Sequence, residues 1–139
     1  MKHGVIAFVF IGLALLIASC GETQSCAELT KEYRIQVDKL ASEWDSANEI
    51  ANSTPRMELT RPITNLQNIR NEYYRLIVPK CAKEAHTLLL DYMDAIIEGY
   101  AAYIAYKPDT TVNDHFTSAA KYFDSWTAAF SKLAVEPTP

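Results

Sequence analysis

The sequence predicts an all-α protein, an up-down-up-down four-helix bundle that follows a cleaved N-terminal signal peptide. Apolar residues recur at alternating steps of three and four in each of four segments, which is typical of amphipathic helices. Short Pro-containing turns separate these segments, and short connections favour antiparallel neighbours in a bundle. No segment shows sustained alternation with a period of two, so we do not expect a sheet.

Residues 1–19 predict a secretory signal. Lys2 supplies a short basic start, and residues 4–18 are almost entirely apolar. A run of about 15 apolar residues is short for a helix that crosses a bilayer, which needs about 20, and fits the hydrophobic region of a signal peptide. The segment has two other interpretations. It is an ordinary signal peptide in which Cys20, the residue that follows it, has no special role, or it is an anchor that is not cleaved.

The end of this segment, Ile17-Ala18-Ser19-Cys20, resembles the lipobox of bacterial lipoproteins. In that family the cysteine thiol is diacylated, and the signal is cut just before it. The resemblance implies that Cys20 is lipidated and that the mature domain lies outside the cytoplasm, anchored to the cell membrane or outer membrane. Gly21 stands where an Asp often retains such proteins at the inner membrane, so in a cell with an outer membrane we expect the protein there.

The mature chain, residues 20–139, is long enough for one domain. We expect a lipidated tether over 20–25, the four-helix bundle over 26–135 and a flexible tail over 136–139, where Pro137 and Pro139 oppose a helix.

The first helix is predicted to begin after Ser25, which has capping-box spacing with Glu28, and to end near Pro55. Its apolar positions are Leu29, Tyr33, Val37, Leu40, Trp44, Ala47 and Ala51. The second helix starts at either Thr54-Pro55 or Thr60-Arg61-Pro62, because Pro suits a first turn, and the pattern breaks at Val78-Pro79. Its apolar positions are Leu59, Ile63, Leu66, Ile69, Tyr73, Leu76 and Ile77.

The third helix is predicted to begin at Ala82 and to end at Lys107-Pro108-Asp109, and it is the most apolar of the set. Gly99 inside it indicates close packing of another helix. The fourth helix is predicted to begin with Thr111 as its N-cap. Its apolar positions are Val112, Phe116, Ala119, Phe123, Trp126, Phe130 and Leu133.

Antiparallel helices bring the start of the first helix, the turn before the third and the end of the fourth to one end, which we name the proximal end. Cys26 and Cys81 both fall there, and disulfides persist outside the cytosol, so we expect a bond between them. The alternative is two unpaired buried thiols. The turns at residues 53–56 and 107–110 share the opposite, distal end, where a partner from outside has access.

Composition excludes several classes of function. The formal net charge is −4, which opposes binding to a nucleic-acid backbone, and there is no Gly-rich loop for a nucleotide phosphate. His86 and His115 are predicted near opposite ends, so they do not share a metal, and no nucleophile–base arrangement stands out. We therefore expect no enzyme activity, no metal and no cofactor.

Arg70 falls inside the apolar face of the second helix. Together with Tyr73, His86 and Tyr92 it is predicted to line a small polar pocket for a carboxylate or another anion. The interpretation we favour is structural: Arg70 extends to the surface or pairs with a nearby acid, and His86 is a hydrogen-bonded histidine of the core or its boundary. A single-histidine haem or metal site at His86 is a further alternative. The acidic strip formed by Asp91, Asp94 and Glu98 is predicted to be a solvated face, with cation binding as the alternative.

The stretch 78–82, followed by Ala85-His86 and by residues 91–95, resembles uncharacterised small helical-bundle lipoproteins, and this resemblance implies no activity. The leading hypothesis is a membrane-anchored, non-enzymatic module that binds a protein or another component of the cell envelope. One alternative is a small-molecule binder or sensor that uses the bundle interior. Another is a phage-exclusion or immunity lipoprotein that occludes a membrane partner.

Overall fold

The computed structural model describes residues 25–134, and all the regular secondary structure in that range is helical. Its long helices are α1 (Cys26–Ser53), α2 (Thr60–Tyr74), α3 (Lys83–Ile104) and α4 (Asp109–Lys132). Two short 3-10 helices, η1 (Arg56–Glu58) and η2 (Lys80–Ala82), precede α2 and α3. The all-α class and the four helices are thus confirmed, whereas the predicted signal peptide, Cys20 and the tail from residue 136 lie outside the described residues.

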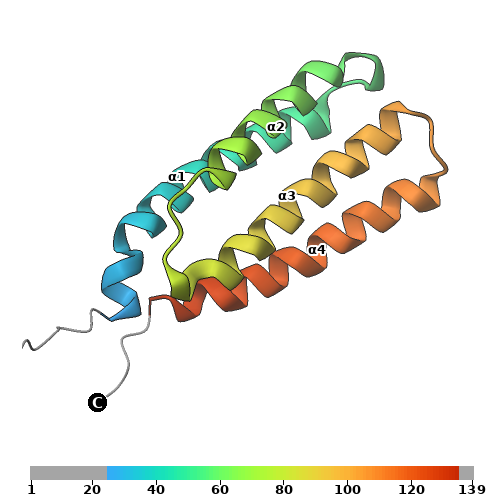
Figure 1. Cartoon of the computed structure of the whole chain (residues 1–139). Helices are drawn as coiled ribbons and strands as arrows, with labels where there is room; N and C mark the ends of the chain where they lie inside the picture. Colours follow the sequence, from blue (N-terminus) through green and yellow to red (C-terminus); the bar gives the residue numbers. More distant parts are fainter. Residues whose placement is uncertain (1–24, 135–139) are drawn as a thin grey trace, which may run out of the picture.

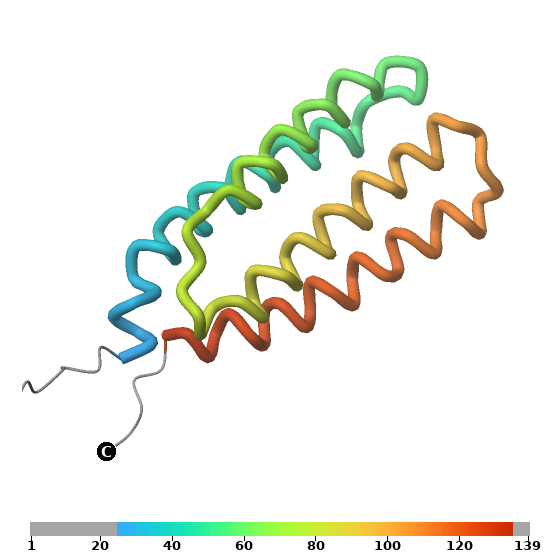
Figure 2. Tube along the Cα trace, in the orientation of Figure 1, coloured from blue at the N-terminus to red at the C-terminus, as the bar shows by residue number. Residues whose placement is uncertain are grey.

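The helices lie side by side as two pairs, α1 with α2 and α3 with α4 (Figures 1 and 2). At the proximal end Thr30 Oγ1 lies 3.4 Å from the Leu133 carbonyl oxygen, so the start of α1 meets the end of α4. At the distal end the Arg56 guanidinium lies 3.8 Å from the centre of the Tyr103 ring, so the two remaining turns meet there.

The sulfur atoms of Cys26 and Cys81 lie at disulfide-bonding distance, with their Cα atoms 6.2 Å apart. This is the spacing that a disulfide requires, and it joins the first turn of α1 to η2. The predicted pairing of these two cysteines is therefore present.

The first residues of α1 and α2 agree with the helix starts that the sequence predicted. The Glu28 N–H donates to Ser25 Oγ at 3.3 Å, so Ser25 is the N-cap of α1. α2 takes the later of its two predicted starts, with Pro62 in its first turn, where a missing N–H costs no hydrogen bond.

The predicted continuation of α2 through Leu76 and Ile77 is wrong. The helix ends at Tyr74, and the Ile77 side chain is 93% exposed. Pro79 disfavours the helical conformation at the residue before it. Because α2 is much shorter than α1, the chain must also run in an irregular stretch from Tyr74 to reach Cys81 at the proximal end.

The predicted N-cap of the last helix is also wrong, because α4 begins at Asp109 rather than after Thr111. Pro108 has extended backbone angles and occupies the cap position, and its carbonyl accepts the first helical hydrogen bond from the Val112 N–H at 3.2 Å. Helical hydrogen bonding therefore starts before Thr111 is reached.

Buried residues follow the predicted faces closely, and the exceptions lie on α1 and α4. Leu29 is 48% exposed, while its neighbour Thr30 is buried and donates its hydroxyl to the Cys26 carbonyl at 2.7 Å. On α4, Ala119 and Ala129 occupy the innermost positions, and Phe123 is 42% exposed. Small residues at the contact let α4 approach α3, which leaves the large rings to flank the contact.

Gly99 explains part of this close approach. A Cβ atom at that position would lie 2.9 Å from the ring of Phe116 on α4, which is T-shaped against Tyr100 with ring centres 5.4 Å apart. The glycine therefore makes room for the aromatic ring, as its place in the pattern predicted.

Among the helices of residues 25–134, none combines the length and the apolar character needed to cross a bilayer.

Candidate functional site

The structure does not gather the four predicted pocket residues into one site. Two of them, Tyr73 and His86, stack with ring centres 4.4 Å apart. They are joined by Tyr33, whose hydroxyl oxygen lies 2.8 Å from the Tyr73 hydroxyl and 3.2 Å from His86 Nδ1. All three side chains are buried, so the cluster is a satisfied core network in which every hydroxyl has a partner.

Burial sets the protonation of this network. It lowers the pKa of His86, which favours the neutral imidazole, and a neutral Nδ1 then accepts a hydrogen bond from the Tyr33 hydroxyl. Burial likewise raises the pKa of Tyr33 to about 12, against a smaller opposing effect of the hydrogen bond with Tyr73. The pKa of Tyr73 is also raised, again mainly by burial. The network is therefore uncharged around neutral pH.

This assignment predicts that stability falls on the acid side. Below about pH 6.5 the unfolded chain binds a proton on His86 that the folded chain excludes, so the stability present above that pH is lost as the pH falls. The slope from this one group is at most about 1.4 kcal/mol per pH unit. Urea denaturation between pH 7.5 and pH 5 measures it.

The control for this measurement compares two histidine variants. His86→Gln should lose the slope that His86 contributes, whereas His115→Gln, at the part-exposed histidine of α4, should keep it. The two variants differ in which histidine is lost, so a slope that falls in His86→Gln and stays in His115→Gln is assigned to His86. An unchanged slope in His86→Gln contradicts a buried neutral imidazole.

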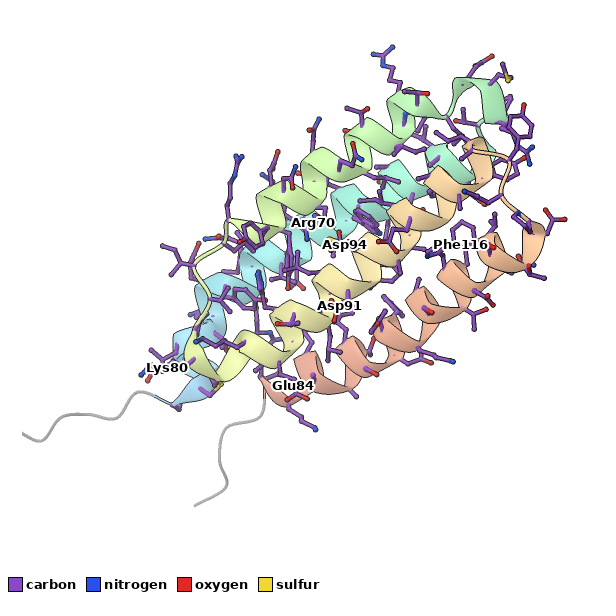
Figure 3. The ribbon with its side chains drawn as sticks, turned by 45° about the vertical axis from the view of Figure 1, so that its right-hand side comes forward. Arg70, Lys80, Glu84, Asp91, Asp94 and Phe116 are labelled. Atoms are coloured by element: carbon purple, nitrogen blue, oxygen red, sulfur yellow. A yellow bond between two sulfur atoms is a disulfide. The ribbon has the colours of Figure 1, made fainter. Side chains whose placement is uncertain are left out.

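Arg70 has its own partner, Asp94 on α3 (Figure 3). Its Nε and Nη2 donate to the two carboxylate oxygens at 2.8 and 2.7 Å, a bidentate pair that raises the arginine pKa. The Tyr74 ring lies 5.4 Å from the guanidinium carbon. The guanidinium group that could have held an anionic ligand is thus occupied by the carboxylate of Asp94. This is the outcome in which Arg70 pairs with a nearby acid.

Tyr92, the fourth predicted pocket residue, packs in the middle of the bundle. Its hydroxyl accepts a hydrogen bond from Trp44 Nε1 at 3.4 Å, and its ring contacts Phe123 with centres 5.3 Å apart. Burial raises its pKa, so it is a neutral phenol at ordinary pH. It contributes to packing between α1, α3 and α4.

The acidic strip on α3 is exposed in part, with the Asp94 and Glu98 side chains 44% and 64% exposed, but its members also meet neighbouring helices. Asp91 and Asp94 are half-buried, and Glu98 lies 3.3 Å from His115 Nδ1 on α4. The reason is that α3 packs against α2 on one flank and α4 on the other, so residues opposite its core face meet neighbouring helices. Within the described part of the chain, no cluster of three His, Cys, Asp or Glu side chains could hold a metal ion.

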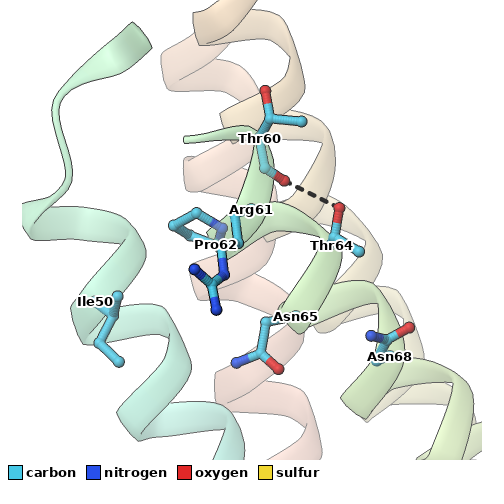
Figure 4. A pocket seen from close by; sticks show the side chains of 7 residues that line it. All are labelled: Ile50, Thr60, Arg61, Pro62, Thr64, Asn65 and Asn68. Atoms are coloured by element: carbon cyan, nitrogen blue, oxygen red, sulfur yellow. Dashed lines mark hydrogen bonds between the residues drawn. The ribbon is translucent and has the colours of Figure 1, made fainter. Parts of the chain in front are cut away.

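An open groove of about 930 Å³ lies between α1 and α2 (Figure 4). It is lined by Ile50, Thr60, Arg61, Pro62, Thr64, Asn65 and Asn68. The only hydrogen bond among these side chains and their backbone joins the Thr64 hydroxyl to the Thr60 carbonyl within one helix turn. The groove presents no converging set of charged groups that would orient a ligand.

The distal end presents a more distinctive arrangement, which we name the distal cluster: Arg56, Met57, Tyr103 and Tyr106. The Arg56 guanidinium carbon lies 3.8 Å from the Tyr103 ring centre and 4.5 Å from that of Tyr106. Tyr106 donates to Met57 Sδ at 3.7 Å. Met57 is 83% exposed and Tyr106 is 68% exposed, so the cluster has a large apolar outer face.

Arg56 has no carboxylate partner within residues 25–134, and its Nε is buried without a hydrogen bond. An arginine stacked on aromatic rings keeps its N–H edge directed outward in the plane of the guanidinium, where it can bind a carboxylate. The distal cluster therefore combines a cation with exposed apolar and aromatic surface.

Tyr106 occupies a backbone position that usually belongs to glycine. Its φ is 56°, and the chain closes the end of α3 with hydrogen bonds from the Tyr106 N–H to the Tyr103 carbonyl and from the Lys107 N–H to the Ala102 carbonyl. These are the two bonds of a Schellman motif, in which a left-handed residue is normally Gly. A side chain at a left-handed position costs about 1 kcal/mol or more. The contacts of the Tyr106 ring must compensate for this strain.

The sequence predicted the distal turns as the accessible end but did not single out these side chains. Lys107-Pro108 marks the end of α3, and a helix end predicts a left-handed residue just before that dipeptide. A tyrosine in place of the expected glycine was the available signal.

Comparison of the chain with protein-family models, with curated proteins and with solved structures finds no match.

Proposed function

We propose that the chain is a membrane-anchored lipoprotein whose mature part, an up-down-up-down four-helix bundle, is a non-enzymatic binding module of the cell envelope. Cys20 carries the lipid, and the distal cluster binds a protein partner. The observation that carries this proposal is Arg56 stacked between Tyr103 and Tyr106 beside the exposed Met57.

The composition of the distal cluster supports a protein partner. Tyr, Arg and Met are enriched in the centres of protein interfaces, where aromatic and arginine side chains contribute most of the binding energy. A backbone position that penalises any side chain yet carries an exposed tyrosine is a further sign that the ring has a role beyond folding. The partner surface we expect offers a carboxylate next to an apolar patch.

The position of the cluster supports the same conclusion. Residues 21–25 span at most about 18 Å, so a lipid on Cys20 holds the proximal end near the membrane. α1 has 28 residues and, at about 1.5 Å per residue, extends roughly 40 Å toward the distal end. A module built this way presents the distal cluster to partners some 40 Å above the lipid surface.

The anchor is tested by the intact mass of the protein from the membrane fraction, with and without reduction. We expect the mass of residues 20–139 plus acyl chains, with two further hydrogens after reduction of the Cys26–Cys81 pair. Cys20→Ala is the control and should abolish both acylation and cleavage. An uncleaved or unacylated wild-type mass overturns the anchor.

The binding surface is tested by a photocrosslinking amino acid placed at Met57 in cells. We expect a discrete adduct from this position and none from Ser125, an exposed residue in the second half of α4. Arg56→Ala should weaken the adduct at least ten-fold, because it removes the cation of the distal cluster. Identical adducts from both positions, or none from either, contradict a partner at the distal end.

Tyr106→Gly separates binding from folding. Glycine relieves a left-handed strain of about 1 kcal/mol, and loss of the stacking on Arg56 removes about 0.5–1 kcal/mol. We therefore expect the free energy of unfolding to change by less than about 1 kcal/mol, as measured by urea denaturation, while the Met57 adduct is lost. Unimpaired crosslinking in this variant removes Tyr106 from the binding surface.

A further inference from the structure

The proximal end carries a second exposed apolar surface, far from the distal cluster. Ile77 is the most exposed large apolar side chain in the described part of the chain, and Leu29, near the start of α1, is also exposed. Ile77 lies in the irregular segment 75–79 that connects α2 to η2. Its neighbours Leu76 and Val78 pack against the core, so the segment is held in place with Ile77 pointing away.

The segment is fixed on both sides. The Arg75 and Leu76 N–H groups donate to the carbonyls of Glu72 and Tyr73 at 3.2 and 3.1 Å, which closes the end of α2. On the other side Cys81 is paired with Cys26 at the start of α1. The exposed isoleucine is therefore part of a rigid turn and not the tip of a long loop.

Basic residues surround this turn. The proximal end, taken as residues 25–34, 72–84 and 130–134, holds six Lys and Arg against four Asp and Glu. The rest of the described chain holds six basic residues against eleven acidic ones. Arg75, Lys80 and Lys83 flank Ile77, are exposed and make no ion pair with a described residue. The charge of the molecule is thus divided between its ends, positive at the proximal end and negative elsewhere.

The same end is where the chain leads toward its N-terminus. Ser25 caps α1 beside the Cys26–Cys81 pair, and Lys80 lies at the end of the bundle where α1 begins (Figure 3). An acylated Cys20 would hold this end within about 18 Å of a membrane surface. A positive surface with an exposed apolar side chain is complementary to the interface of an anionic bilayer.

We infer that the proximal end docks on an anionic lipid surface. Ile77 enters the headgroup region, while Lys80 and Lys83 contact lipid phosphates. This contact fixes the bundle upright on the membrane rather than leaving it free to tumble on its tether. The inference rests on the proposed anchor for its placement, but the contact itself is made by residues of the folded domain.

The test uses the purified acylated chain in vesicles that contain brominated phospholipids, which quench tryptophan fluorescence at close range. Ile77→Trp places a reporter in the proposed contact, and Met57→Trp places one at a comparably exposed apolar position at the distal end. In vesicles with anionic lipid we expect the fluorescence that Trp at position 77 adds to that of Trp44 and Trp126, taken as the difference from the wild type, to be quenched by at least half relative to non-brominated vesicles. We expect no added quenching at position 57.

The charge requirement is tested by changing the lipid and the lysines. Zwitterionic vesicles, or high salt, should remove most of the quenching at position 77. Lys80→Glu combined with Lys83→Glu should weaken the contact more than ten-fold, because each cation near an anionic surface contributes roughly five-fold. Lys107→Glu, an exposed lysine of the distal turn, is the matched control and should leave the quenching unchanged.

Each outcome bears on one hypothesis. Equal quenching at positions 57 and 77, or none at 77, overturns the docked proximal end even if the mass shows acyl chains. If the chain forms an oligomer in which Trp at position 77 is shielded from lipid, the surface binds a second copy of the chain. This result also overturns the docked proximal end. A mass without acyl chains overturns the anchor alone, and quenching at position 77 by added anionic vesicles then still supports the lipid contact.

Discussion

Replacing both Cys26 and Cys81 with serine is expected to lower the free energy of unfolding by about 4 kcal/mol. The two residues close a loop with a sequence separation of 55, and the chain-entropy model assigns about this value to a loop of that length. The loop contains all of α1 and α2, so the cross-link restricts about half of the described chain. Urea denaturation of the oxidised wild type and of the double variant measures the difference.

A reducing agent provides the control for this prediction. It should destabilise the wild type by a similar amount and leave the double variant unchanged. The single change Thr30→Ala also removes a contact at the proximal end, the hydroxyl near the Leu133 carbonyl, and should cost only about 1 kcal/mol. Insensitivity of the wild type to reduction would mean that the two thiols lie together without being bonded.

The consequence for function is local. The cross-link fixes the start of α1 to the turn that carries Ile77. Its loss should therefore disturb the proximal surface before the distal cluster, which is held by contacts between η1 and the end of α3. We expect reduction to diminish lipid quenching at position 77 under conditions in which crosslinking from position 57 persists.

The helices were predictable because their signal is local. Apolar residues at helical spacing determine which face is buried, and on α1 the positions from Tyr33 to Ala51 are buried as the pattern indicates. The expectation that short turns join antiparallel helices then placed Cys26 and Cys81 at one end, and the two residues do lie together. Neither step required knowledge of side-chain contacts.

The side-chain partners were not predictable for a physical reason. Arg70 and His86 were expected to face each other, but the identity of a partner depends on helix rotation and axial offset to within a few ångströms. Arg70 pairs with Asp94, which lies about two turns beyond His86 on α3. An extended arginine side chain spans about one helical turn, so its partner need not lie at the level of its own backbone. Periodicity fixes a face only to within one or two residues, which is too coarse to choose between these partners.

The distal cluster was missed for a similar reason. Its members come from η1 and from the end of α3, which are far apart in the sequence. Its strongest local signal, a left-handed backbone at Tyr106, is a conformation that the sequence pattern does not assign to a tyrosine. Both candidate surfaces thus depend on the ends of helices, where tertiary contacts override local preference.

Trp44→Ala is expected to lower the free energy of unfolding by about 3–5 kcal/mol. Trp44 is among the largest fully buried side chains and contacts Tyr92 with ring centres 6.0 Å apart. Removing it loses the transfer free energy of the indole and leaves a cavity that rigid helices fill only in part. Circular dichroism during urea denaturation measures the loss.

The matched control for this prediction is Trp126→Ala, at the half-buried tryptophan of α4. Its cost should be clearly smaller, because Trp126 lies on the flank of the α3–α4 contact and stacks on Phe130 rather than filling the interior. Tyr92→Phe, which removes the acceptor of the Trp44 N–H, should cost about 1 kcal/mol. If Trp126→Ala proved as costly as Trp44→Ala, the packing of α4 would matter as much to the interior as the contact that Trp44 makes between α1 and α3.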